Sequence, residues 1–512
     1  MSYTSIPLTV KDFDDVRRGI CFGCGCNCGY IAYLKEKKII DVYGDPLNPN
    51  NIGSLCSKGI TLCQQIPYNP LRVKNPLLRR NGNEWEQVGK EQVIAWIKGN
   101  IKGRVGIFLD RFTDLIDYKV AKRITENIYS DAVYLPFRAS SLSPQQWVNK
   151  KLILMFECEP VFSEVMATRW LVDAFEKGSY IVTVSSRYTT APSKAKKRIL
   201  LKPPLVIRFL EDLTKAVRGE IVNNPLKEEI EKIAELLRFM EGSSLIVIGD
   251  VLLHSPWKNN VFKALKKLRS ILKVDYSIVG DVSNQEIMEL PRFLEDVEKL
   301  DSLIVFGNPA VYMNENLIQV LKEKPVLHFT LFPNLTSNCA SLVVPTLLFQ
   351  ERDFFGYRSS FGSSFASKVI DPPENSFCLS DIFPLPHVEV PENSSLPFIE
   401  HWEENFSSAF VEEKGVYLLF DRVLSEEIGH WSLWTHELSP QQEAIMNGKT
   451  AEKLGVKEIL NIGDIKLSVK ISSNIADDTV FIPFSFEETQ PFGSGVRIGR
   501  LIKRKGYRIE KL

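Results

Sequence analysis

The sequence predicts a multi-domain α/β protein with a cysteine-rich N-terminal domain, two Rossmann-like α/β domains and a small C-terminal β-barrel. Three observations lead to this prediction. At 512 residues the chain is long enough to bury several hydrophobic cores. After Pro76, short apolar segments alternate with amphipathic segments, which is the pattern of strands and helices in βαβ units. From about Gly415 onward the pattern changes to strands with one helix.

The α/β part contains two sets of such elements. Residues 152–156 are all apolar, as expected of a strand that is buried on both faces. An amphipathic helix is predicted over 161–177 and the next strand over 180–185, which together make a right-handed βαβ unit. A second set begins at Ser244, and its apolar strand near 303–310 ends in Gly-Asn-Pro. Ligands of nucleotide type bind at such strand ends, although a simple turn is the plainer alternative.

The changes in pattern suggest four domains. The third is expected to end in a linker between Ile370 and Pro397, where Pro, Ser and Asn are frequent. The predicted domains are a cluster domain at 1–78, two α/β domains at 79–240 and 241–397, and the β-barrel domain at 398–512.

Composition excludes several classes of function. Lys+Arg and Asp+Glu are equal at 63 each, so no overall field attracts nucleic acid or an anionic membrane. No apolar run approaches the ~20 residues of a membrane span, and no transmembrane segment is expected. The first residues lack a signal-peptide core, and Arg17-Arg18 does not lie in an export signal. Nine cysteines without a paired framework favour a reducing compartment, so we expect a cytoplasmic protein.

The most informative motif is C-x2-C-x3-C-x27-C, formed by Cys21, Cys24, Cys28 and Cys56. Four thiolates, three from one tight loop and one from a later segment, are typical ligands of a [4Fe–4S] cluster. Zinc is the main alternative, but structural zinc sites usually pair two C-x2-C knuckles or add histidines. The sequence has no second C-x2-C and no histidine before His254. The motif leaves Cys26 as a spare, packed thiol.

Further motifs follow these cysteines in order, and together they resemble the molybdopterin oxidoreductases. This family contains formate dehydrogenases, nitrate reductases and the large iron–sulfur subunit of complex I. The resemblance covers nearly the whole chain. The segments that carry it are Lys58-Gly59, Ser185–Ala191, Gly307-Asn308-Pro309, Val343-Val344-Pro345 with Glu351, His430-Trp431, and Ala451–Leu454-Gly455 with Gly463-Asp464.

The resemblance implies a cofactor, site residues and partners. The cofactor would be a molybdopterin guanine dinucleotide with molybdenum or tungsten, bound with the help of Lys58, Arg187, Asn308, His430 and Trp431. Lys58 would lie between the cluster and the pterin. Two-electron chemistry would occur at the metal, and electrons would leave through the cluster. Because the chain has one cluster motif, partner subunits with flavin, ferredoxin-type clusters or a quinone site are expected.

The sequence differs from the family pattern in the segments expected to surround the metal end of the pterin. The stretch expected to supply a metal ligand, Phe137–Leu142, contains Ser140 and Ser141 but no cysteine or histidine. The first G-x-N-P turn is replaced by Glu157-Cys158-Glu159-Pro160, whose carboxylates would repel phosphate. Two interpretations follow: a formate dehydrogenase-like oxidoreductase, or a non-catalytic electron-transfer subunit with a degenerate pterin site, like the large subunit of complex I. The sequence assigns no catalytic residue and no substrate.

Overall fold

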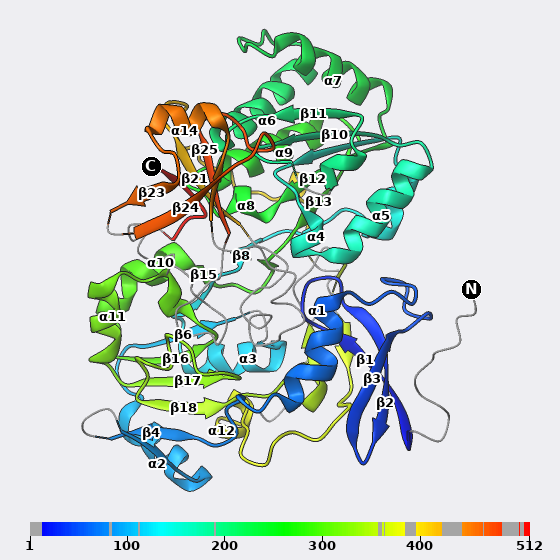
Figure 1. Cartoon of the computed structure of the whole chain (residues 1–512). Helices are drawn as coiled ribbons and strands as arrows, with labels where there is room; N and C mark the ends of the chain where they lie inside the picture. The colour runs from blue at the N-terminus through cyan, green and yellow to red at the C-terminus, as the bar shows by residue number, and fades with distance from the viewer. Residues whose placement is uncertain are drawn as a thin grey trace.

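The structure is a computed structural model of the 512-residue chain. It places the N-terminal sheet beside two α/β layers, and the C-terminal sheet against the upper of these layers (Figure 1). The described residues are 13–80, 84–110, 113–188, 191–356, 361–362, 364–384, 396–421, 443–463, 465–483, 501 and 506–512.

The N-terminal domain is an antiparallel meander followed by a helical segment. Its strands are β1 (Asp15–Cys21), β2 (Cys28–Lys35) and β3 (Lys38–Gly44), paired in that order. Alternate residues of β2 from Cys28 to Leu34 are buried, because successive side chains of a strand point to opposite faces. The helical segment that packs there consists of α1 (Ser57–Ile60), the π-turn Thr61–Gln65 and the 3-10 turn Ile66–Tyr68.

The first α/β layer is an eight-stranded sheet in the order β15-β7-β6-β16-β17-β18-β4-β5. Pairing is parallel from β15 to β18 and antiparallel at β4 and β5. In this order, the strands are Met288–Glu289, Ile128–Ser130, Val105–Leu109, Ser302–Phe306, Val326–Thr330, Leu342–Pro345, Leu77–Arg79 and Trp85–Gln87. Its helices include α2 (Lys90–Asn100), α3 (Leu115–Ile124), α10 (Leu290–Asp296), α11 (Glu315–Lys322) and α12 (Leu379–Ile382).

The second α/β layer is a five-stranded parallel sheet in the order β11-β10-β9-β12-β13. In this order, its strands are Lys197–Leu200, Tyr180–Ser185, Leu152–Phe156, Ser244–Gly249 and Asp275–Val279. The predicted strands at 152–156 and 180–185 are confirmed. Its helices are α4 (Pro160–Ser163), α5 (Val165–Glu176), α6 (Pro203–Val217), α7 (Lys227–Phe239), α8 (Asp250–Leu253) and α9 (Lys258–Ile271).

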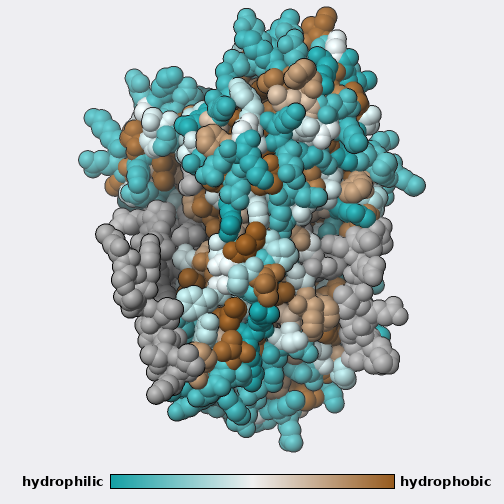
Figure 2. All heavy atoms as spheres, turned by 90° about the vertical axis from the view of Figure 1, so that its right-hand side faces the viewer, coloured by the Kyte–Doolittle hydropathy of each residue, from teal (hydrophilic) through white to brown (hydrophobic). Residues whose placement is uncertain are grey.

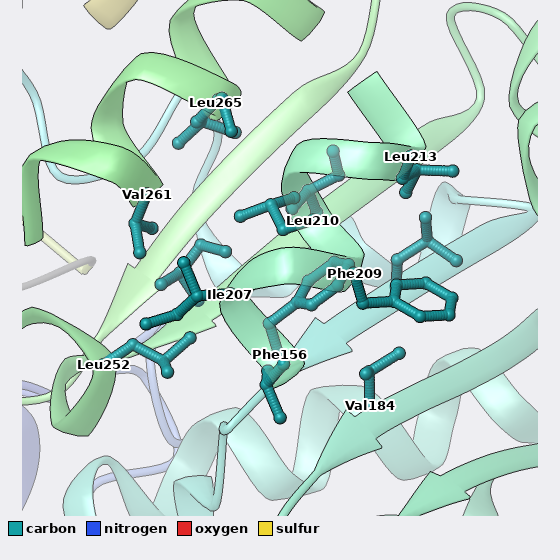
Figure 3. Packing of buried hydrophobic residues seen from close by; sticks show 14 of the residues in the cluster. Phe156, Val184, Ile207, Phe209, Leu210, Leu213, Leu252, Val261 and Leu265 are labelled. Atoms are coloured by element: carbon teal, nitrogen blue, oxygen red, sulfur yellow. The ribbon is translucent and has the colours of Figure 1, made fainter. Parts of the chain in front are cut away.

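The helix predicted over 161–177 is divided into α4 and α5. Glu164 has φ −129° and ψ 81°, outside the helical region, and it is fully buried between the two helices. Helix α6 packs its apolar face against the five-stranded sheet. Figure 3 shows Phe209 of α6 beside Phe156 and Val184 of the strands, and the ring centroids of Phe156 and Phe209 are 6.4 Å apart. This contact makes α6 part of the largest described core cluster.

Each α/β sheet takes strands from both sides of residue 240, where the sequence analysis placed a domain boundary. The eight-stranded sheet combines β6 and β7 with β16 to β18, and the five-stranded sheet combines β9 to β11 with β12 and β13. The strands between 139 and 280 are therefore an insertion between two halves of the larger sheet. Apolar periodicity identifies strands, but it does not identify their pairing partners.

The C-terminal part forms a mixed six-stranded sheet in the order β23-β24-β22-β25-β21-β26, with α14 (Gly448–Leu454). In this order, its strands are Ile459–Ile462, Ile465–Ile471, Ala444–Met446, Thr479–Pro483, Tyr417–Asp421 and Ile509–Lys511. The predicted multi-domain α/β class with a strand-rich C-terminal end is confirmed. None of the helices in the described part of the chain combines the length and the apolar character that a membrane crossing requires.

Smaller elements connect these layers. The strand pair β8 (Val133–Tyr134) and β14 (Val282–Ser283) joins the two α/β layers, and β19 (Phe354–Gly356) pairs with β20 (Ser364–Ala366) near the N-terminal domain. The remaining described turns of helix are Pro144–Asn149, Ala191–Lys194, Val297–Lys299, Pro309–Tyr312, Phe349–Glu351 and Ile399–His401.

Candidate functional site

The four motif cysteines come from the end of a β-hairpin and the start of a helix. Cys21 is the last residue of β1, Cys28 is the first of β2, and the two are directly opposite in the ladder. Cys24 lies in the turn between them. Cys56 is the N-cap of α1, and its Sγ accepts a hydrogen bond from the Gly59 N–H at 3.4 Å. A Cβ on Gly59 would be 3.5 Å from the Cys21 Sγ, so the helix and the hairpin meet at these sulfurs.

The thiols are buried and close enough to perturb one another. Burial, followed by the charges of Cys24 and Cys21, raises the pKa of Cys56 to about 11. The pKa of Cys28 is also about 11: a hydrogen bond with Cys26 lowers it, while burial and the charges of Cys24, Cys21 and Cys56 raise it. Four sulfurs that repel one another as thiolates need a cation to hold them together, and an iron–sulfur cluster supplies it.

Lys58 provides positive charge at the same place. Its side chain is buried in α1, and its charge lowers the pKa values of Cys21, Cys24 and Cys56. The Lys58 Nζ also donates to the backbone oxygen of Phe162 at 3.4 Å. Phe162 belongs to α4, at the carboxyl end of the five-stranded sheet. Lys58 therefore lies between the cysteines and this sheet edge, which suits the bridging position that the resemblance implies.

The other two nearby cysteines have local roles. Cys26 is fully buried, and its Sγ accepts the Met166 N–H at 3.3 Å, which ties the cysteine loop to α5. The Cys63 thiol hydrogen-bonds to Cys21 and lowers the pKa of Cys21. Within the described residues, no three His, Cys, Asp or Glu side chains converge on one metal-ion position. A cubane is bound at four separate corners, so its ligands do not share a single point.

Arg187, a predicted cofactor-binding residue, is held by protein groups. Its guanidinium forms an ion pair with the carboxylate of Asp421, at the end of β21, and both side chains are buried. The guanidinium carbon also lies 4.2 Å from the ring centroid of Phe481 and 5.8 Å from that of Phe162. Arg187 thus connects the five-stranded sheet to the C-terminal sheet.

Asn308 lies at the corresponding edge of the eight-stranded sheet, directly after β16. Its Oδ1 accepts hydrogen bonds from the Thr336 N–H at 3.1 Å and the Thr336 hydroxyl at 2.9 Å. Gly307 before it has φ +77°, and a Cβ there would be 2.8 Å from the Asp110 side chain, so glycine suits this turn. The side-chain oxygen of Asn308 therefore fixes the following loop.

The stretch expected to supply a metal ligand is an edge of the five-stranded sheet. The Ser140 hydroxyl donates to the backbone oxygens of Leu142 and of Tyr276, the latter at 3.0 Å. The Ser141 hydroxyl donates to Asp275 at 2.7 Å and accepts the Tyr276 N–H at 2.9 Å. Both serines are thereby engaged in pairing this segment with β13.

The turn after β9, which replaces the first G-x-N-P turn, contains a strained and buried acid. Glu157 has φ +41°, in the left-handed region that favours glycine, and it is 5% exposed. Its Oε1 accepts the Ser186 N–H at 2.7 Å. Burial, only partly opposed by hydrogen bonds from Ser186 and the charge of Arg187, raises the pKa of Glu157 to about 7.

Further acids gather around this turn. The pKa of the Cys158 thiol is raised well above its ordinary value, first by burial and then by four carboxylates. These belong to Glu159, Glu164, Asp250 and Asp421. Two of these carboxylates have arginine partners at the same edge of the sheet: Asp421 pairs with Arg187, and Asp250 pairs with Arg508.

The space beside the cysteine loop is small. A cavity of about 40 Å³ lies between Cys24 and Gly25 on one side and Leu109, Asp114 and Asp281 on the other. Ligand pockets usually enclose roughly 300–1,000 Å³. The cavity formed here by the described residues is well below that range.

Two of the predicted cofactor-binding residues, His430 and Trp431, lie outside the described residues. Two buried contacts at this site were not predicted from the sequence: the Arg187–Asp421 ion pair and the Glu157–Ser186 hydrogen bond. Each joins segments that are far apart in the chain or on different strands, and no local pattern in the sequence indicates either one. A local pattern does indicate the positive φ of Glu157, because Glu157 occupies the place of a glycine in the family's turn.

Comparison with known proteins agrees with the cysteine geometry. Residues 14–67 match the family model described as "Molybdopterin oxidoreductase Fe4S4 domain". The chain is 26% identical over 239 residues to formate dehydrogenase subunit alpha of Megalodesulfovibrio gigas, a match covering 39% of this chain and 23% of the relative. It is 41% identical over 80 residues to periplasmic nitrate reductase of Campylobacter fetus subsp. fetus (strain 82-40), covering 15% of this chain and 8% of the relative. The matches thus span less than a quarter of the length of either relative.

Among solved structures, acetylene hydratase from Pelobacter acetylenicus has the same fold, with a TM-score of 0.68 and 13% sequence identity. The similarity covers 93% of this chain and 95% of that one. The fold over nearly the whole chain and the Fe4S4 domain at 14–67 therefore agree with the resemblance that the motifs carry. Residues 14–67 are thus a molybdopterin oxidoreductase Fe4S4 domain, and the chain is similar to the formate dehydrogenase and nitrate reductase named above, as its motifs predicted.

Proposed function

We propose that the chain is an iron–sulfur oxidoreductase subunit that passes electrons through one [4Fe–4S] cluster, held by Cys21, Cys24, Cys28 and Cys56. The observation that carries the proposal is the meeting of the hairpin end and the α1 N-cap, with the buried Lys58 beside them. The cluster would accept and release one electron at a time. Lys58 would stabilise the reduced, more negative state.

The catalytic form of this proposal is a formate dehydrogenase-like enzyme with a molybdenum or tungsten pterin. The similarity to formate dehydrogenase subunit alpha supports it. In that case the pterin would supply the two-electron chemistry, and Lys58 would connect it to the cluster. His430 and Trp431 would hold its nucleotide end.

A second candidate is a non-catalytic electron-transfer subunit with a degenerate pterin site, as in the large subunit of complex I. Three observations favour it. Ser140 and Ser141 are engaged in sheet pairing, Arg187 is paired with Asp421, and the turn at Glu157 is surrounded by acids. Under this interpretation no side chain of the 137–142 segment coordinates a metal, and turnover of formate or nitrate by the isolated subunit is slow or absent.

Partner subunits are part of both proposals. A single cluster needs a further electron carrier nearby, such as a flavin, a ferredoxin-type cluster or a quinone site. The N-terminal domain carries the exposed apolar side chains Val16, Tyr43, Leu47 and Ile52, which suit a protein contact. The face of the molecule that carries this domain shows apolar patches between hydrophilic regions (Figure 2). The free thiols that a cluster site requires favour a reducing, cytoplasmic setting.

Anaerobic purification followed by metal and pterin analysis tests these proposals. Both predict about four irons and four acid-labile sulfides per chain. Stoichiometric molybdenum or tungsten with pterin would select the catalytic form, and its absence from a fully iron-loaded protein would select the second. A full cluster signal in Cys56→Ala together with its loss in Cys26→Ala would overturn the ligand assignment.

A further inference from the structure

A tyrosine shares one face of the hairpin with two of the proposed cluster ligands. In the β1–β2 ladder Gly19 is opposite Tyr30, and Cys21 is opposite Cys28. Residues opposite each other, and residues two apart on one strand, project from the same face of a sheet. Tyr30 therefore lies on the cysteine side of the hairpin, and it is fully buried.

The ring of Tyr30 crosses β1 at Gly19. A Cβ on Gly19 would lie 2.5 Å from both the hydroxyl oxygen and the Cζ of Tyr30. Only a residue without a side chain leaves room for the ring there. Gly19 and Cys21 are two residues apart, about 6.6 Å along the strand. The Tyr30 hydroxyl at Gly19 and the Cys21 side chain therefore lie on the same face of β1, one position apart on that face.

This hydroxyl is buried, and none of the described residues is its hydrogen-bond partner. Buried tyrosine hydroxyls normally find a partner, because a buried donor left unpaired is destabilising. The phenol is therefore an unused donor on the same face of the hairpin as Cys21 and Cys28.

We propose that Tyr30 donates its hydroxyl hydrogen to the Cys21 sulfur when the cluster is bound, and that it thereby raises the reduction potential of the cluster. The inference rests on the proposed function, since it requires Cys21 to be a ligand. Reduction adds negative charge to the cluster and its ligand sulfurs. A hydrogen bond to a ligand sulfur therefore stabilises the reduced state more than the oxidised state. Tyr30 is a positioning residue, because it acts through Cys21.

The test is an EPR-monitored redox titration of the iron-loaded chain and of Tyr30→Phe. Loss of the donor is expected to lower the one-electron reduction constant by up to tenfold, which corresponds to about 59 mV. Tyr33→Phe is the matched control: it removes a hydroxyl from the opposite face of the same strand, where Tyr33 packs on Phe13 and Tyr43, and no change is expected.

Gly19→Ala is a second variant, because its Cβ displaces the Tyr30 ring while the hydroxyl remains in the chain. It is expected to lower the potential in the same direction. Equal midpoint potentials in the wild type, Tyr30→Phe and Gly19→Ala, at equal iron content, would overturn the inference and leave the proposed function intact. A wild-type chain that binds no four-iron cluster would instead overturn the proposed function.

Discussion

Glu157 makes the stability of the five-stranded sheet edge depend on pH. Its pKa is raised from 4.5 to about 7 in the fold, chiefly by burial. Below pH 4.5 the folded and unfolded states both hold the proton, so the stabilisation is fully present. Between pH 4.5 and 7 only the folded state holds it, and stability falls as the pH rises. At 1.36 kcal/mol per pH unit, the loss approaches about 3 kcal/mol above pH 7.

The substitution Glu157→Gln should remove this dependence. A glutamine Oε1 can still accept the Ser186 N–H, and it carries no charge at any pH. The variant is therefore expected to gain stability relative to the wild type across this window, by about 3 kcal/mol in total.

Hydrogen exchange at the Ser186 amide is the suitable assay, because several domains do not unfold as one two-state unit. Exchange protection is compared between the variant and the wild type at each pH from 4 to 8, so the intrinsic pH dependence of exchange cancels. Glu229→Gln is a control, since Glu229 pairs with Lys197 near the surface and its pKa is lowered. A constant difference between Glu157→Gln and the wild type at pH 4 and pH 8 would refute the reasoning.

Three further predictions concern buried charges. Arg187→Met should destabilise the region around β21 by about 3–5 kcal/mol, because it leaves Asp421 buried without its cation, and adding Asp421→Leu should recover most of this loss, as measured by hydrogen-exchange protection of the β21 amides. Arg72 and Glu351 form a buried ion pair with two hydrogen bonds, at 2.5 and 2.6 Å. Arg72→Met should therefore also be destabilising, and adding Glu351→Leu should recover most of the lost stability. If either double variant were as unstable as its single Arg→Met variant, the pair would not act through charge compensation. Lys58→Gln should lower the cluster potential in a redox titration, and an unchanged potential would show that the ammonium group does not interact with the cluster.

Individual strands and the cysteine segments were predicted from the residues within and beside them. The apolar run at 152–156 gave the buried strand β9, and the cysteine spacing led to a hairpin end and a helix N-cap that meet in space. The break of the predicted helix at Glu164 was missed, since no proline or glycine marks it. The acidic residues at the Glu157 turn were noted from the sequence, but the burial that raises the pKa of Glu157 to about 7 was not predicted.

Long-range arrangement could not be predicted in the same way. Each α/β sheet contains strands from before and after residue 240. Pairing depends on the whole fold and not on the periodicity of each strand. The predicted role of Arg187 as a cofactor residue came from the motif around it. The sequence does not show that Asp421, more than two hundred residues later, lies against its guanidinium.

The central claim is that Cys21, Cys24, Cys28 and Cys56 hold one [4Fe–4S] cluster and that Cys26 does not. Iron and acid-labile sulfide analysis, with EPR of the dithionite-reduced protein, tests it in the wild type, Cys56→Ala and Cys26→Ala. We predict about four irons and four sulfides in the wild type and in Cys26→Ala, and a lost or altered cluster in Cys56→Ala. One tetrahedral metal ion per chain, or a full cluster in Cys56→Ala, would contradict the account.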